Sequence, residues 1–109
     1  MKKLFLYVIG SLIIQPVYSQ HLIKGTIIDS ENTVMPMVNV AFLNQADSTL
    51  VTGAVSDSCG VYSTSLAGGN YIIRYSYLGY ETLYRNIQVN ANLTLSVVKM
   101  ELAQTELEG

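Results

Sequence analysis

Residues 71–78 constrain the fold of this chain more than any other stretch, because apolar side chains recur there at every second position. That period belongs to a β-strand, in which successive side chains point to opposite faces of a sheet. Glycine-containing turn signals stand on both sides of the stretch. The alternation therefore predicts a strand that turns one face to a core, and this face carries Tyr71, Ile73, Tyr75 and Tyr77.

Six further segments are rich in β-branched or alternating apolar residues and are separated by turn signals. They cover residues 22–28, 38–42, 49–55, 61–66, 82–89 and 93–100. Gly25, inside the first of them, predicts a bulge or a close approach to the backbone. After residue 19, no run of ten or more residues keeps the 3.6-residue period of an amphipathic helix. The sequence therefore predicts an all-β fold, an antiparallel β-sandwich of about seven strands.

The first 19 residues have the composition of a secretory signal peptide. Lys2 and Lys3 give a positive start, residues 4–14 are almost wholly apolar, and Ser19 offers a small side chain for cleavage. The rival interpretation is an uncleaved membrane anchor. It is disfavoured because about 11 apolar residues are fewer than the roughly 20 that a spanning helix needs. We therefore expect export, and no membrane span in the mature chain.

The expected organisation has three parts. A signal peptide covers residues 1–19, one β-sandwich domain covers residues 20–102, and a polar, acidic tail over residues 103–109 begins a linker. Loss of the signal peptide would leave four basic residues against eight acidic ones, a formal charge of −4 in place of −2. Nucleic-acid-binding modules carry clustered Lys and Arg, so this balance excludes that class of partner.

The parts of a reactive centre are missing from the sequence. His21 is the only histidine and Cys59 the only cysteine, too few ligands for a typical zinc site and too few residues for an internal disulfide. Gly68 and Gly69 are too isolated to cradle a phosphate, since no helix follows them. Acidic residues of the expected loops lack the alternating spacing of a calcium site, so we interpret them as turn formers. These residues are Asp29, Glu31, Asp47 and Asp57. We therefore expect no enzyme, and no catalytic residue, cofactor or metal site.

Six of the eight tyrosines lie after residue 19 and have two alternative roles. Those in residues 71–78 recur at period two, so we interpret them as core residues. Exposed aromatic rings elsewhere can stack on sugar rings or anchor a partner protein. The candidate ligand or partner contacts are Tyr62, Tyr80 and Tyr84.

Five pieces of the chain, in this order and spacing, resemble the carboxypeptidase-regulatory-like domain, a transthyretin-like or prealbumin-like β-sandwich. They are residues 23–29 (IKGTIID), 35–40 (MPMVNV), 56–62 (SDSCGVY), 69–71 (GNY) and 77–81 (YLGYE). The resemblance covers about residues 21–102. In Gram-negative bacteria this domain commonly forms the N-terminal extension of TonB-dependent outer-membrane receptors, behind a signal peptide. The resemblance therefore implies a location in the periplasm or outer membrane, a protein partner in the cell envelope, and no hydrolysis.

Two positions depart from the family pattern. Met37 stands where glycine is usual, and Cys59 stands where a polar or acidic residue is usual. The plug and barrel of such receptors are not present in these 109 residues, so the resemblance implies no transport. The expected function is that of a non-enzymatic, exported accessory or interaction module of a receptor, or of a standalone or truncated copy. The alternative is a carbohydrate-binding module, which would use exposed rings at Tyr62, Tyr80 and Tyr84.

Overall fold

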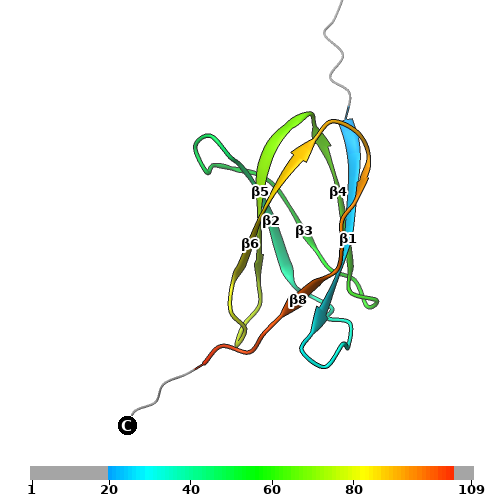
Figure 1. The fold of residues 1–109 in the computed structure, drawn as a ribbon, viewed down its shortest axis with the longest axis vertical. Coiled ribbons are helices and arrows are strands. Elements are labelled where there is room, and N and C mark those ends of the chain that lie inside the picture. Colours follow the sequence, from blue (N-terminus) through cyan, green and yellow to red (C-terminus); the bar gives the residue numbers. More distant parts are fainter. Residues whose placement is uncertain (1–19, 105–109) are drawn as a thin grey trace, which may run out of the picture.

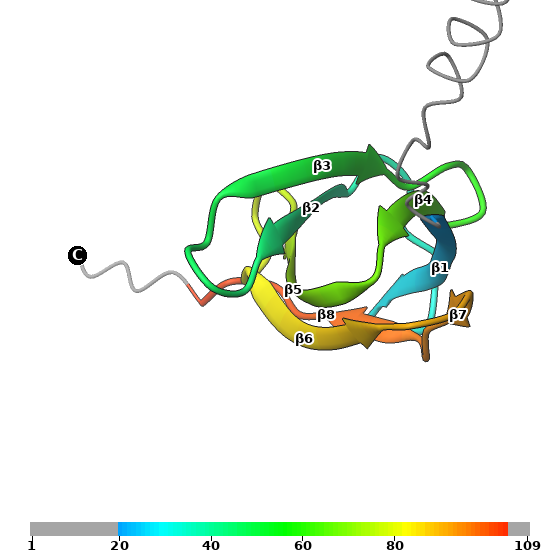
Figure 2. The same cartoon turned by 90° about the horizontal axis from the view of Figure 1, so that it is seen from above.

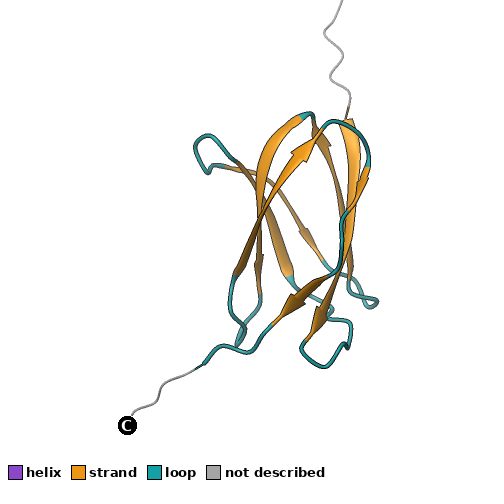
Figure 3. Cartoon of the chain, viewed as in Figure 1, coloured by secondary structure: helices purple, strands orange, loops and turns teal. Residues whose placement is uncertain are grey.

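The computed structural model describes residues 20–104, which form strands joined by turns and loops (Figure 1). No helix occurs among them, so none there is long enough to cross a membrane (Figure 3). The all-β prediction is confirmed, while the signal peptide expected over residues 1–19 lies outside the described part of the chain. The strands are β1 (Gln20–Asp29), β2 (Asn39–Asn44), β3 (Leu50–Val55), β4 (Val61–Ala67), β5 (Gly69–Ser76), β6 (Leu83–Val89), β7 (Leu93–Thr94) and β8 (Val98–Met100).

The strands form two sheets that face each other across the core (Figures 1 and 2). One sheet has the order β4-β1-β7, with β8 also pairing with β1, and the other has the order β3-β2-β5-β6. The second sheet and the β1–β4 pair are antiparallel, whereas β7 and β8 run parallel to β1. The sandwich is therefore mixed and not wholly antiparallel. The reason is that the chain leaves β6, crosses to the other sheet and then runs beside β1 in the same direction.

The C-terminal strand expected over residues 93–100 is divided into two short strands. Between them, the N–H of Leu95 donates to the carbonyl of Lys24 at 2.8 Å. The side-chain phase shifts across the break, so that Val97 is exposed while Val98 is buried. A continuous strand keeps every second residue on one face, so a shift from Leu93 and Leu95 to Val98 and Met100 requires a break, which divides the expected strand in two.

β5 carries the buried row that the alternation predicts. Tyr71, Ile73 and Tyr75 are 7%, 0% and 0% exposed. Tyr77 is 37% exposed, because β5 ends at Ser76 and the chain turns before the next inward position. The prediction that Tyr77 packs in the core is therefore wrong.

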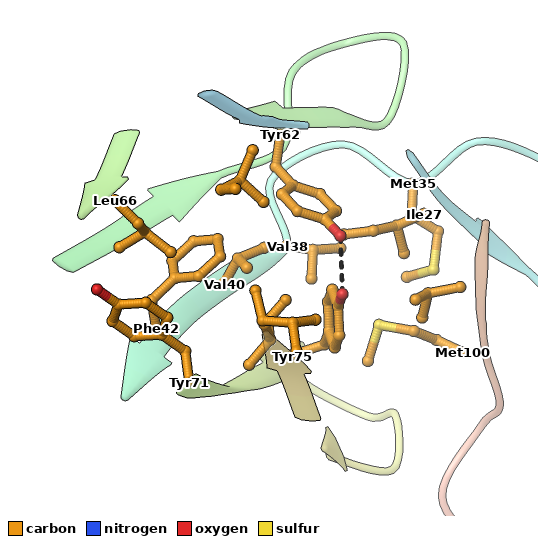
Figure 4. Packing of buried hydrophobic residues seen from close by; sticks show 14 of the residues in the cluster. Ile27, Met35, Val38, Val40, Phe42, Tyr62, Leu66, Tyr71, Tyr75 and Met100 are labelled. Atoms are coloured by element: carbon orange, nitrogen blue, oxygen red, sulfur yellow. Dashed lines mark hydrogen bonds between the residues drawn. The ribbon is translucent and has the colours of Figure 1, made fainter. Parts of the chain in front are cut away.

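Gly25 on β1 is a point of close approach, as its position within a strand suggests. Its register partner on β4 is Tyr62, and a Cβ at residue 25 would overlap the Tyr62 ring. Tyr62 points into the core, where its hydroxyl oxygen lies 2.7 Å from that of Tyr75 (Figure 4). The absence of a side chain at Gly25 thus leaves room for the Tyr62 ring.

The core is filled from both sheets by aliphatic residues and by the four aromatic rings of Phe42, Tyr62, Tyr71 and Tyr75 (Figure 4). The Tyr62 and Tyr75 centroids are 5.6 Å apart at an interplanar angle of 71°, the edge-to-face arrangement that aromatic pairs favour. The centroid of the Phe42 ring lies 6.4 Å from the centroid of the Tyr62 ring. The fully buried apolar residues are Ile23, Ile27, Val38, Val40, Phe42, Tyr62, Leu66, Ile73, Tyr75 and Met100.

Arg85 joins the two sheets at one edge of the sandwich. It stands on β6 in phase with the buried Ile87 and Val89, and its register partner is the buried Ile73. Its guanidinium donates to the carbonyl of Ser96 at 2.9 Å and to the Ser96 hydroxyl at 2.6 Å, in the β7–β8 connection. A charged group at an inward position thus links β6 to the opposite sheet.

Candidate functional site

The acidic residues of the loops act as turn formers. One carboxylate oxygen of Asp57 accepts hydrogen bonds from the N–H groups of Cys59 and Val61 at 2.8 and 3.0 Å. Asp29 accepts an equivalent pair in the β1–β2 loop, at 2.8 and 3.0 Å. Asp47 accepts from both the N–H and the hydroxyl of the residue two positions on, at 3.1 and 2.8 Å. These hydrogen bonds lower the pKa of Asp57 and of Asp47. The turn interpretation is confirmed for all three residues.

Between residues 20 and 104, no three His, Cys, Asp or Glu side chains gather where they could hold a metal ion. His21 and Cys59 lie toward opposite ends of β4. His21 pairs with Leu66 near the end of that strand, and Cys59 is exposed in the turn before the strand begins. A thiol and its only candidate base are therefore not brought together.

The three tyrosines predicted as contacts occupy three different environments. Tyr62 is 1% exposed, so its ring is a core component and cannot offer a surface to a sugar or a partner. Tyr84 is 64% exposed on β6, opposite Arg74 on β5. Tyr80 is half-buried after the β5–β6 turn and packs partly against the core. The structure therefore does not assemble these three rings into one platform.

Tyr80 is instead paired with Tyr77. Their ring centroids are 5.6 Å apart at 64°, and the N–H of Tyr80 donates to the carbonyl of Tyr77 at 3.0 Å. Between them, Leu78 is 95% exposed and Gly79 takes a positive φ of 89° that closes the turn. With Leu102, which is 62% exposed and forms a β-bridge to Tyr80, these residues make an apolar surface at one end of the sandwich. We call Tyr77, Leu78, Tyr80 and Leu102 the aromatic tip.

The chain that follows β8 is held against the aromatic tip by main-chain hydrogen bonds. The N–H of Glu81 donates to the carbonyl of Glu101 at 2.9 Å, and the N–H of Ala103 donates to the carbonyl of Gly79 at 2.9 Å. These bonds lie on either side of the bridge between Tyr80 and Leu102. The aromatic tip is therefore built from the β5–β6 turn and from the segment that leads out of the sandwich.

Sequence reasoning placed only Tyr80 of the aromatic tip among the candidate contacts. Tyr77 was assigned to the core because its period continues that of β5. The signal against that assignment was Gly79, two residues on, which marks a turn and so the end of the alternation. Leu102 carried no such signal, since only the fold brings it beside Tyr80.

Together, the fold and the aromatic tip define a β-sandwich module that exposes apolar side chains at one end. The chain belongs to the carboxypeptidase regulatory-like domain family, which residues 22–103 match. Over 87 residues it is 34% identical to TonB-dependent receptor P3 of Formosa agariphila. That match covers 79% of this chain and 8% of the receptor, so the chain spans less than a tenth of that relative's length.

Solved structures of other proteins share the fold. The Bacillus anthracis TIE protein superimposes with a TM-score of 0.65 at 19% identity, over 76% of this chain and 17% of that one. BcpA, the major pilin subunit of Bacillus cereus, gives 0.60 at 19% identity, over 78% and 31% of the two chains. Catechol 1,2-dioxygenase from Pseudomonas arvilla gives 0.64 at 10% identity, over 84% and 55%. At these identities the similarity concerns the fold alone.

Proposed function

We propose that this chain is a non-enzymatic, exported β-sandwich module that works as the N-terminal accessory domain of a TonB-dependent outer-membrane receptor, or as a separate copy of such a domain. It acts in the periplasm or at the outer membrane and contacts a protein of the cell envelope. Membership of the carboxypeptidase regulatory-like family and the identity with a TonB-dependent receptor support this proposal.

The observation that carries the proposal is the aromatic tip. Leu78 is 95% exposed at the apex of a turn and is flanked by two tyrosines. Removing such an apolar side chain from water lowers the free energy, so covering it with a partner protein is favourable. Tyrosine is also one of the residues that are enriched at protein interfaces and among their anchors. The patch includes the segment that leads out of the sandwich, so a protein bound there would also contact the chain at its exit.

Site-specific crosslinking tests the proposed partner. The chain, with a tag at its C-terminus, is expressed in its own Gram-negative host with a photo-crosslinking phenylalanine derivative in place of Leu78. The control places the same derivative at Asn86, an exposed position on β6 away from the β5–β6 turn. We expect position 78, and not position 86, to crosslink to a protein of the cell envelope identified by mass spectrometry. Equal products from both positions, or products made only of cytoplasmic proteins, would contradict the proposal.

Export is tested in the same cells by fractionation and by sequencing the N-terminus of the purified protein. We expect the tagged chain in the periplasmic or outer-membrane fraction, with Gln20 as its first residue. Full-length protein confined to the cytoplasm would overturn the proposed location, whatever the crosslinking shows.

A further inference from the structure

A concave surface lies at the end of the sandwich opposite the aromatic tip. β5 begins beside this surface and ends beside the tip. Here the β2–β3 loop and the β4–β5 turn meet around a pocket of about 420 Å³. Its walls come from Asn44, Gln45 and Ala46 on one side and from Gly68, Gly69 and Asn70 on the other. Its volume lies in the lower part of the range of roughly 300–1,000 Å³ that small-molecule sites occupy.

Main-chain hydrogen bonds fix the walls of this pocket. The N–H of Gln45 donates to the carbonyl of Asn70 at 3.2 Å and so joins the two walls. The β2–β3 loop is closed on itself, because the side-chain oxygen of Asn44 accepts from the N–H of Ala46 at 2.9 Å. Below the turn, the Tyr71 hydroxyl donates to the carbonyl of Ala67 at 2.7 Å. A ligand would therefore meet a surface that is already formed, which lowers the entropic cost of binding.

The lining of the pocket carries no charged side chain. Three of its side chains are amides, on Asn44, Gln45 and Asn70, and none is ionisable except the phenol of the buried Tyr71. Amides both donate and accept hydrogen bonds, which matches hydroxyl groups that do the same. Phosphates and carboxylates are matched by Arg, Lys or helix N-termini, and metal ions by carboxylates, so the lining favours neither class. Gly68 and Gly69 are exposed and carry no side chains of their own, so their main chain is accessible to a ligand.

We propose that this amide-lined pocket binds the end of a neutral oligosaccharide through hydrogen bonds from Asn44, Gln45 and Asn70 to sugar hydroxyls. A peptide is the alternative occupant, but peptide recognition relies on a free sheet edge or on apolar pockets for side chains. The pocket offers only the methyl group of Ala46 and the edge of a buried ring. The site goes beyond the docking role proposed above and does not depend on it, because the two surfaces lie at opposite ends of β5.

Binding to immobilised glycans tests the proposal. The purified chain is applied to an array of neutral and acidic oligosaccharides, and the affinity for the best-retained neutral one is measured by calorimetry. We expect Asn70→Ala and Gln45→Ala each to weaken this binding by about three- to tenfold, the effect of one lost hydrogen bond. The matched control is Asn86→Ala, which removes an exposed amide outside the pocket and should leave the affinity unchanged.

Other outcomes overturn the proposal and are distinguishable from one another. Retention of acidic glycans alone, or of no glycan, removes the assigned ligand class. Binding that survives both pocket substitutions but is lost on Tyr84→Ala places the glycan on the exposed face of β6. Unaltered circular dichroism spectra for all variants ensure that a loss of binding is not a loss of fold.

Discussion

At the residue scale, Met37 has a backbone conformation that side chains rarely adopt. Met37 adopts a left-handed conformation with φ of 66°, in the turn that leads into β2, and its side chain is 66% exposed. A side chain with a Cβ is strained in this region, whereas glycine is not. Glycine would therefore suit the turn at this position, and methionine is tolerated at a cost.

We expect Met37→Gly to raise the free energy of unfolding by about 0.5–1 kcal/mol, the strain removed less the extra entropy of an unfolded glycine. Urea denaturation of the two proteins measures the difference. Val55→Gly is the matched control, because it introduces glycine at an exposed strand position and should destabilise the fold by about 0.5–1 kcal/mol. A loss of stability in Met37→Gly equal to that of the control would contradict this account.

The hydrogen bond between the buried hydroxyls of Tyr62 and Tyr75 gives a second prediction. Either single change to phenylalanine leaves one buried hydroxyl without its partner, at a cost of about 1–3 kcal/mol. The double change removes both polar groups, so its cost should be smaller than the sum of the single costs. We expect a coupling free energy of about 0.5–3 kcal/mol in a double-mutant cycle measured by denaturation. Strictly additive costs would mean that the two hydroxyls do not interact in the folded protein.

At the element scale, the sequence predicted the strands well where a strong period and a clear turn coincide. Residues 71–78 and the glycine turns around them located β5 to within two residues at each end. The sequence did not predict the break between β7 and β8, which depends on the fit of the chain along β1. Tyr62 was not assigned to the core, because its place depends on Gly25, 37 positions away in the chain but adjacent across the β1–β4 pair. Such pairs of residues are brought together by the fold, so the local sequence pattern around either residue does not predict them.

Arg85 is the charged residue that interrupts the apolar phase of β6, and its two bonds to Ser96 give the third prediction. Arg85→Ala should lower the free energy of unfolding by about 1–2 kcal/mol, because two hydrogen bonds between the sheets are lost. Hydrogen exchange should also quicken at the amides of β7 and β8, whose main link to β6 is removed. Arg74→Ala, on the neighbouring strand and out of phase with the buried row, should leave that exchange unchanged. Equal effects of the two substitutions would rule out a specific link through Arg85.

At the scale of the whole molecule, the two candidate surfaces lie at the two ends of one closed sandwich. Family resemblance supplied the fold and the class of protein, but neither surface followed from it. The aromatic tip needs the return of residues 101–103 to the β5–β6 turn, and the amide-lined pocket needs two loops from different parts of the chain. Both surfaces depend on segments that only the fold brings together, so local sequence patterns did not reveal them.

We expect the buried Tyr62 to contribute to the response of the whole molecule to alkaline pH. Burial, and then the hydrogen bond to Tyr75, raise the pKa of Tyr62 above its ordinary value of 10.0. In the unfolded chain this phenol loses its proton near that ordinary value. Above it, the unfolded state is deprotonated while the folded state still holds the proton, so the free energy of unfolding falls as pH rises. The contribution is fully present below about pH 10 and declines above it by up to about 1.4 kcal/mol per pH unit.

Urea denaturation at about pH 9, 10 and 11, on either side of the ordinary tyrosine pKa, measures this decline. Tyr62→Phe should be less stable at about pH 9 but should lose less stability between the two highest pH values than the unsubstituted protein, because the buried phenol is gone. Tyr84→Phe removes an exposed phenol and should follow the unsubstituted protein. The comparison of slopes separates ionisation from packing, since a lost contact shifts all three measurements equally. Parallel curves for the unsubstituted protein and Tyr62→Phe would show that the buried phenol does not cause the loss of stability at alkaline pH.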